Sequence, residues 1–317
     1  MPTTTTEKAT MKAVRIHIYG GPEVLRLDEI SRPEPRANEM LIRVHAAGVN
    51  PVDWKIREGL LQGPLPQIMG IDFSGVVESI GGDISEYRVG DAVFGQVADD
   101  SGGYAEYALA LAADVARKPE GLDHVRAAAL PVASLTAWQA LFDTADLEAG
   151  KKVLIHAAAG GVGGFAVQFA KWKGAHVIGT ASAQHADYVR QLGANEVIDY
   201  RQTKFEQVVR DVDVVLDTIG GDTQERSWGV LKRGGTLVSL VQPPSPEKAA
   251  AQGARGVMMR QKPRGDQLAM IADLVVSGKI KVNVETVLPL AEARKAQELS
   301  QKGHVGGKIV LEVRAGK

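Results

Sequence analysis

The sequence contains no cysteine in its 317 residues. This absence excludes disulfide bonds, a cysteine nucleophile, iron–sulfur clusters and every zinc site that uses cysteine. The seven histidines are scattered, and no two have the i, i+4 spacing that would place both rings on one helix face. The sequence therefore predicts no metal centre.

Long apolar segments and an excess of one charge are also missing. No run approaches the ~18–20 uninterrupted apolar residues that a membrane span needs, and residues 1–10 lack the apolar core of a secretory signal. With 37 basic and 38 acidic residues, the formal charge is −1, which gives no attraction for nucleic acid or anionic lipid. We expect a cytoplasmic protein that does not enter a membrane, whose partners are small molecules or other copies of the chain.

Short apolar runs that alternate with period two occupy residues 11–119, where glycine and proline separate them. This pattern predicts an antiparallel, sandwich- or barrel-like β domain. Strands are expected at residues 13–19, 24–30, 40–46, 73–80, 91–96 and 104–110. After residue 122, alanine-rich segments predict helices at residues 125–133 and 135–141, broken near Pro131.

From residue 151 the chain alternates between strand and helix patterns, which predicts parallel βαβ units and a doubly wound α/β sheet. Strands are expected at residues 153–157, 176–180, 196–198, 212–217 and 236–241, and helices at 162–173, 184–192, 205–209 and 223–231. Residues 242–263 are rich in proline and predict a loop around one strand at 256–260. A helix at 265–277 and a strand at 308–313 finish the chain, and periodicity does not decide which domain they join.

The strongest motif is a glycine-rich turn directly after the strand at residues 153–157. Gly161, Gly163 and Ala166 form Gly-x-Gly-x-x-Ala at the start of an amphipathic helix. Glycine permits the tight turn and the close approach of backbone N–H groups to a pyrophosphate at the positive end of the helix dipole. This context predicts a dinucleotide site, and the alternative is a turn that only serves helix–sheet packing.

The following strand indicates which dinucleotide is bound. It ends at residues 178–182 without the Asp or Glu that accepts hydrogen bonds from the ribose diol of NAD. The missing carboxylate permits a 2′-phosphate, to which the Ser182 hydroxyl could donate, and Tyr200 or Arg201 could add a contact. These features favour NADPH as the cofactor.

The order of several motifs resembles the zinc-free quinone oxidoreductase branch of the medium-chain dehydrogenase/reductase superfamily. The motifs are residues 46–53, 89–95, 130–141, 156–168, 196–200, 217–221 and 306–311. The resemblance implies a GroES-like β-barrel catalytic domain from residues 1–122 and 266–317, and a Rossmann NADP-binding domain at residues 123–265 between them. It further implies a homodimer that reduces quinones or α,β-unsaturated carbonyls without zinc. We also expect the first 10 residues to be disordered.

The same resemblance assigns site residues. Asn50 would face the nicotinamide and the substrate, in a segment where zinc-dependent relatives carry a ligating cysteine. Our hypothesis is that its amide polarises the substrate carbonyl. Ser182 and Tyr200 would contact the 2′-phosphate. The other cofactor contacts would be Thr136, Gly160, Gly161, Val162, Gly163, Thr180, Ile219, Leu240, Val241 and Lys308. Residues 57–66 lack the aromatic side chain that many quinone reductases have there.

Four of the candidate residues have simpler structural interpretations. Asn50 could be a turn residue before Pro51, and Asp53 is interpreted as a helix cap rather than a general acid. The Thr136 hydroxyl could bond to its own helix backbone, and Lys308 could be a solvated charge at the start of a strand.

Two other functions fit the same motifs. An NADPH-binding protein with a structural or regulatory role would keep the glycine turn without turnover. An enoyl-thioester reductase would need a basic entrance for a carrier's phosphopantetheine, and the sequence offers only Arg255, Arg260, Lys262 and Arg264 for it.

Overall fold

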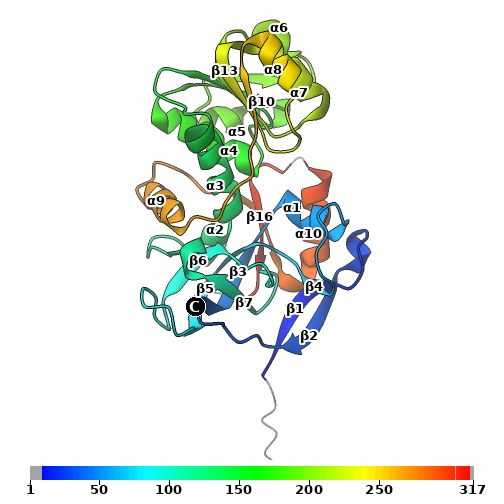
Figure 1. Cartoon of the computed structure of the whole chain (residues 1–317), viewed down its shortest axis with the longest axis vertical. Coiled ribbons are helices and arrows are strands. Elements are labelled where there is room, and N and C mark those ends of the chain that lie inside the picture. Colours follow the sequence, from blue (N-terminus) through cyan, green and yellow to red (C-terminus); the bar gives the residue numbers. More distant parts are fainter. Residues whose placement is uncertain (1–8, 304, 315–317) are drawn as a thin grey trace, which may run out of the picture.

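The computed structural model describes residues 9–303 and 305–314, and these form a strand-rich half and an α/β half (Figure 1). The strand-rich half lies at the bottom of the view and the α/β half at the top. The predicted disorder of the first 10 residues is wrong for Thr10, which begins the first strand, and residues 1–8 lie outside the described residues. Within the described part of the chain, no helix is both long and apolar enough to cross a membrane.

The strands of the lower half form two sheets. The smaller sheet has the order β2-β1-β4, and the larger has the order β15-β16-β3-β5-β6-β8, with β7 also paired to β3. All the strands predicted from period-two alternation are present, but closure into a barrel stays a prediction. The strands are β1 (Thr10–Ile16), β2 (Arg26–Ser31), β3 (Glu39–Val49), β4 (Gln67–Ile68), β5 (Asp72–Ile80), β6 (Ala92–Gln96), β7 (Tyr107–Leu111), β8 (Val115–Arg117), β15 (Val284–Pro289) and β16 (Lys308–Glu312).

The strand predicted at residues 308–313 joins the strand-rich half, because β16 lies in the larger sheet. β16 pairs antiparallel with β3, so that Ile309 lies opposite Val49 and Val310 opposite Gly48. Gly48 is required here because a Cβ atom would lie 2.3 Å from the backbone oxygen of Ala128. This register places Lys308, the first residue of β16, beside Asn50, the residue that follows β3.

The upper half contains a six-stranded sheet in the order β11-β10-β9-β12-β13-β14. All its pairs are parallel, which is the Rossmann arrangement predicted from the sequence. The strand order reverses between β9 and β12, and ligands of such sheets bind at the carboxyl ends of the strands next to this point. The strands are β9 (Lys152–Ile155), β10 (His176–Ala181), β11 (Glu196–Asp199), β12 (Val212–Asp217), β13 (Leu231–Ser239) and β14 (Arg255–Met258).

The α-helices connect and cover both halves. They are α1 (Pro51–Arg57), α2 (His124–Ala128), α3 (Pro131–Trp138), α4 (Gly161–Lys173), α5 (Ala186–Gln191), α6 (Phe205–Val208), α7 (Gly221–Ser227), α8 (Pro246–Gln252), α9 (Gly265–Val276) and α10 (Ala293–Lys302). A π-helical turn at Gln139–Thr144 extends α3, and short 3₁₀ helices occur at Pro22–Val24, Ala112–Asp114, Ala183–His185, Trp228–Val230 and Leu290–Glu292. The predicted break near Pro131 is confirmed, since it separates α2 from α3.

Three details of the predicted secondary structure are wrong or incomplete. Residues 242–263 are not only a loop and a strand, because they contain α8. Ser245 caps that helix by accepting from the Lys248 N–H group, and Gly253 ends it in the left-handed region at φ 61°. The helix expected at residues 223–231 ends at Ser227, and β4, β8, β15 and α10 were not predicted at all.

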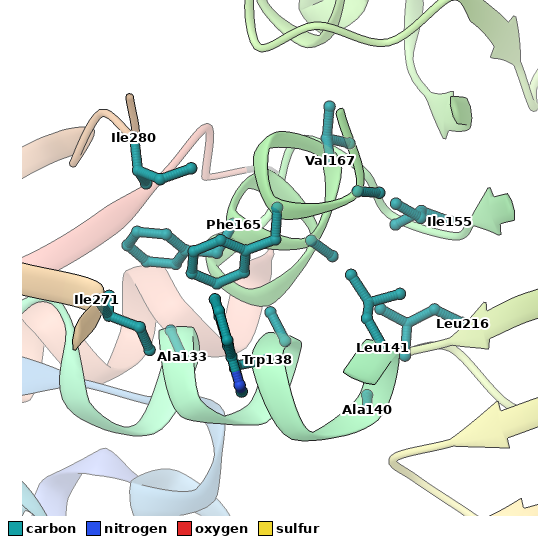
Figure 2. Close-up of a cluster of buried hydrophobic side chains, with 14 of the residues drawn as sticks. Ala133, Trp138, Ala140, Leu141, Ile155, Phe165, Val167, Leu216, Ile271 and Ile280 are labelled. Carbon is teal, nitrogen blue, oxygen red and sulfur yellow. The ribbon is translucent and has the colours of Figure 1, made fainter. Parts of the chain in front are cut away.

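The largest core surrounds α3 and α4 (Figure 2). The side chains of the two helices face each other, with Ile155 and Leu216 of the parallel sheet on one side and Ile271 and Ile280 on the other. All these side chains are buried. This packing holds α3 firmly against the first helix of the nucleotide-binding half, while the start of α3 reaches the strand-rich half.

Candidate active site

The glycine-rich turn joins β9 to α4 in the geometry that a pyrophosphate site requires. A Cβ atom on Gly163 would lie 2.2 Å from the backbone oxygen of Ala157, so no side chain fits there. Gly160 is the N-cap of α4 and gives it no side-chain cap, which leaves the N–H groups of the first turn open to a ligand. These N–H groups and the positive end of the helix dipole suit a phosphate.

A buried hydrogen-bond chain supports this turn from behind. Ala157 has the left-handed φ of 49°, and its N–H donates to the Thr180 hydroxyl at 3.3 Å. That hydroxyl also lies 3.2 Å from Nδ1 of His156, whose Nε2 lies 2.9 Å from the Ser227 hydroxyl. Burial lowers the pKa of His156 to about 4, so the ring is neutral and can accept at Nδ1. The Thr180 hydroxyl thus has partners within the protein, and a direct cofactor contact by Thr180 stays a prediction.

The other predicted cofactor residues gather at the carboxyl edge of the parallel sheet. Ser182 follows β10 and Tyr200 follows β11, and the strand register pairs the preceding residues, Ala181 and Asp199. Ser182 is 4% exposed, whereas Tyr200 is 51% exposed. The Arg201 guanidinium lies 5.7 Å from the centre of the Tyr200 ring. The loops that follow β12 and β13 place Ile219, Leu240 and Val241 at the same edge.

Asp217 holds two of these loops together, and the sequence gave no sign of this function. Its buried carboxylate accepts the N–H groups of Ile219 at 3.0 Å and Gly220 at 2.8 Å. It also accepts the Ser239 hydroxyl at 2.8 Å and the Gln224 amide at 2.9 Å. Because one carboxylate binds both loop starts, the backbone next to the expected ribose and nicotinamide is fixed.

Asn50 lies at the centre of a second, fully buried polar group in the strand-rich half. Its amide nitrogen donates to Oδ2 of Asp72 at 2.8 Å, and its amide oxygen accepts from Nζ of Lys308 at 2.5 Å. Lys308 also donates to the backbone oxygen of Val49 at 3.0 Å. Asn50 is 2% exposed and Lys308 is 4% exposed. Lys308 is therefore not a solvated charge, and that interpretation is wrong.

Asp53 completes the group from the first turn of α1. One oxygen of its carboxylate accepts the Asn50 backbone N–H at 2.8 Å and the Tyr104 hydroxyl at 2.8 Å. Asp53 is thus the helix cap that the sequence predicts. Asn50 precedes Pro51 with extended backbone angles, so it is a helix N-cap as well as a member of the buried group.

The sequence predicts neither Asp72 nor Tyr104 as a site residue, although Asp72 anchors a third element. Its second oxygen accepts the Val132 N–H in the first turn of α3 at 3.0 Å. Within the same helix, the Thr136 hydroxyl donates to the Val132 backbone oxygen at 2.6 Å, as the simpler interpretation expected. A role for Thr136 beside the nicotinamide stays a prediction.

Burial dominates the electrostatics of this group. It raises the pKa of Asp72 to about 7 and that of Asp53 to about 6, and the ammonium of Lys308 opposes both shifts. Burial lowers the pKa of Lys308, against the opposite influence of the two carboxyls. The group therefore has one buried cation shared by two carboxyls that release their protons close to neutral pH.

We expect the elevated pKa of Asp72 to make stability depend on pH. The unfolded chain ionises Asp72 near pH 4 and the folded chain near pH 7, so this residue's stabilising contribution is present at low pH and is lost as pH rises from about 4 to 7. Asp72→Asn removes that dependence. The difference in unfolding free energy, variant minus wild type, should therefore increase as pH rises from about 4 to 7, by at most ~1.4 kcal/mol per pH unit.

Urea unfolding of both proteins at pH 5 and pH 8 measures this difference. The exposed Asp187→Asn variant, which loses only a surface ion pair with Arg190, is the control and should show no such change. An Asp72→Asn effect of the same size at both pH values would contradict the expectation.

Lys308 connects the buried group to the glycine turn. A Cβ atom on Gly161 would lie 3.0 Å from Cδ of Lys308, so the lysine stem passes directly over the first glycine of the motif. The structure thus brings Asn50, Lys308 and the glycine-rich turn close together, although they lie far apart in the sequence.

No group of three or more His, Cys, Asp or Glu side chains within the described residues could hold a metal ion. Two of the scattered histidines do meet, because the rings of His45 and His124 stack at 4.4 Å. His45 lies in β3, five residues before Asn50, but neither ring has a hydrogen bond to the buried group around Asn50 among the described contacts, and burial lowers the pKa of both rings.

Two domain families match the chain: the alcohol dehydrogenase GroES-like domain over residues 36–120 and the zinc-binding dehydrogenase domain over residues 192–311. The quinone oxidoreductase of Sus scrofa is 34% identical and covers 96% of this chain and 99% of its own. The solved quinone oxidoreductase from Coxiella burnetii is 39% identical with a TM-score of 0.92, and covers 96% of this chain and 100% of that chain. The Escherichia coli quinone oxidoreductase complexed with NADPH is 31% identical with a TM-score of 0.89, and covers the same shares.

A GroES-like domain combined with a Rossmann sheet is the architecture of medium-chain dehydrogenases/reductases. Within that superfamily, the chain belongs to the zinc-free quinone oxidoreductase branch. The resemblance read from the sequence is confirmed, and it places this chain in a family of oxidoreductases.

Proposed function

We propose that this protein is an NADPH-dependent, zinc-independent oxidoreductase that reduces quinones or α,β-unsaturated carbonyls by hydride transfer. The observation that supports it best is the single site formed by the glycine turn and Asn50, which the Lys308 side chain connects. The E. coli relative solved with NADPH has the same fold over 96% of this chain.

The residues at the carboxyl edge of the sheet fit a dinucleotide. Gly160, Gly161, Val162 and Gly163 would hold the pyrophosphate, since the position of Gly163 admits no side chain and the N–H groups of the first helical turn are open. Ile219, Leu240 and Val241 would lie along the ribose and nicotinamide, on backbone that Asp217 fixes.

The preference for NADPH rests on Ser182 and Tyr200. They follow neighbouring strands, so both hydroxyls can donate to one 2′-phosphate, and Arg201 next to Tyr200 adds a positive charge. A carboxylate at position 182 would repel that phosphate. Asp199, whose carboxylate accepts the Arg201 N–H group, is the nearby acid that could favour NADH instead.

When bound, NADPH supplies the hydride, and the protein needs few catalytic side chains. Asn50 would donate an amide N–H to the substrate oxygen and stabilise the negative charge that develops there. The proton that completes the reduction would come from solvent or a bound hydroxyl. The Rossmann and GroES-like halves, which we assign to residues 123–265 and to residues 1–122 with 266–317, would position the two reactants.

The decisive measurement is the rate of NADPH and NADH oxidation with a simple quinone and, separately, with a short enone. We expect faster oxidation of NADPH with at least one acceptor. Ser182→Asp should lower kcat/KM for NADPH by at least about tenfold and leave the value for NADH nearly unchanged, because the added carboxylate opposes only the 2′-phosphate.

Ser85→Asp, at an exposed serine remote from this edge in the sequence, is the matched control for the added charge and should change neither value. Equal use of NADH and NADPH by the wild type would contradict the NADPH preference. Tight NADPH binding without reduction of any acceptor would favour the structural or regulatory alternative.

The enoyl-thioester alternative gains no support from the basic residues near α9. All of Arg255, Arg260, Lys262 and Arg264 are exposed, and Arg264 is paired with Asp266. The predicted homodimer would be formed through β14, which is an edge strand of the six-stranded sheet, and the homodimer and the cytoplasmic location stay predictions.

A further inference from the structure

The Asn50 amide has only one orientation that its neighbours allow. The Lys308 ammonium has only hydrogen-bond donors, so the amide oxygen of Asn50 must face it. The amide nitrogen cannot accept a hydrogen bond, so it must face the Asp72 carboxyl. We propose that Lys308 and Asp72 are positioning residues that fix this orientation and direct the remaining amide N–H of Asn50 toward the substrate oxygen. The proposal rests on the proposed function and deepens it.

Both positioning residues are themselves held in place. Lys308 has a second partner, the backbone oxygen of Val49, and Asp72 has a second partner, the Val132 N–H. The Asn50 backbone is fixed by Asp53. Every polar atom next to the amide is therefore fixed by a hydrogen bond to a different element, which gives the preorganisation that transition-state stabilisation requires.

The lysine also affects the chemistry of the amide. An ammonium 2.5 Å from the amide oxygen draws electron density toward that oxygen, which makes the N–H groups stronger donors. One N–H is used by Asp72, and the amide has two. The buried ammonium would thus act on the substrate carbonyl through the Asn50 amide.

The simplest competing role for Lys308 is that of a counter-ion for the cofactor phosphates. Its stem lies over Gly161, so the ammonium is close to the pyrophosphate turn. In that role, loss of the charge would weaken NADPH binding and would do so whether or not Asn50 is present. The positioning role predicts instead that the loss acts on hydride transfer and only through Asn50.

A double-mutant cycle separates the two roles. We expect Lys308→Met to lower the single-turnover rate of NADPH oxidation by about 10–100-fold and Asn50→Ala to lower it by about 100-fold, as when one donor to a developing oxyanion is removed. In the Asn50→Ala protein, the added Lys308→Met change should have less than about a threefold effect, because the two residues act as a unit. Lys308→Arg should recover part of the rate.

NADPH affinity, measured by fluorescence titration, completes the comparison. We expect Kd for NADPH to change less than about threefold in Lys308→Met, and the exposed Lys279→Met variant to match the wild type throughout. Additive effects on the rate, or a loss in affinity as large as the loss in rate, would overturn the positioning role.

A measurement that does not require catalysis tests the inference even if neither the quinone nor the enone is a substrate. In protein labelled with ¹⁵N-asparagine, the Asn50 side-chain amide, assigned with Asn50→Ala, should exchange its protons with solvent slowly. Lys308→Met should accelerate that exchange by at least about tenfold, and Lys279→Met should not. Unchanged exchange in Lys308→Met would overturn the inference even if the enzyme reduces quinones, whereas failure to reduce any acceptor with the exchange result intact would overturn only the proposed function.

Discussion

Replacing Gly163 by valine is expected to abolish dinucleotide binding. A Cβ atom at this position would lie 2.2 Å from the backbone oxygen of Ala157 and 2.8 Å from Cα of Ala158. These are backbone atoms, so no side-chain rotation can relieve the contact, and the turn must move away from α4. We expect Kd for NADPH to rise by at least about 100-fold, which corresponds to ~2.7 kcal/mol.

Fluorescence titration of NADPH measures this effect, and thermal unfolding shows whether the variant is folded. Gly82→Val is a matched control, because no atom lies within 4 Å of a Cβ atom at Gly82. If Gly163→Val does not fold, Gly161→Ala provides a milder change, since its Cβ would lie no closer than 3.0 Å to the flexible Lys308 stem and 3.6 Å to the Gly307 backbone oxygen. Normal NADPH binding by folded Gly163→Val would show that the turn is not the pyrophosphate site.

The glycine turn was predictable from sequence because everything that defines it is local. The strand, the glycines and the helix are consecutive, and Gly163 is required by a contact with Ala157 within that segment. Alternation of strands and helices likewise predicted the Rossmann sheet, including the bounds of β12. Parallel strands all end at the same edge of their sheet. Ser182, Tyr200 and Ile219 each follow such a strand, so their common location could be expected from the sequence.

The buried group around Asn50 was not predictable by the same reasoning. Asn50 lies 22 residues from Asp72 and 258 residues from Lys308, and no periodicity links them. The pairing of β5 with β3 brings Asp72 to Asn50, and the pairing of β16 with β3 brings Lys308 there. A single sequence shows a lysine at the start of a strand, and it does not show that the ammonium is buried.

The missed helix α8 had a local signal that composition concealed. Three prolines at residues 243–246 suggested a loop, yet Ser245 followed by Pro246 is a favourable helix start, and Gly253 is a favourable helix end. The error was to interpret proline as a helix breaker at a position where proline begins helices.

Replacing Arg57 by methionine is expected to cause the largest loss of stability among the side-chain substitutions at buried hydrogen-bonded sites. The guanidinium at the end of α1 is completely buried. It donates to the backbone oxygen of Gly20 at 3.1 Å, to Gln297 at 3.0 Å and to Gln301 at 2.9 Å, and it pairs with Glu58 at 3.1 Å. Methionine fills much of the volume but leaves these acceptors without a donor, so we expect the free energy of unfolding to fall by about 3–5 kcal/mol.

Urea unfolding at neutral pH measures this loss, and the exposed Arg88→Met variant, which removes the same charge from the surface, should stay within about 0.5 kcal/mol of the wild type.

We also expect Arg57→Met to affect the candidate active site. Arg57 joins α1, which begins after Asn50, to α10, which precedes Lys308, so it helps to hold the segments around these two residues in place. Arg57→Met should therefore accelerate proton exchange at the Asn50 amide under conditions where the protein is still folded. An Arg57→Met protein with wild-type stability would show that the contacts between α1 and α10 form without the guanidinium, and that β16 alone positions Lys308.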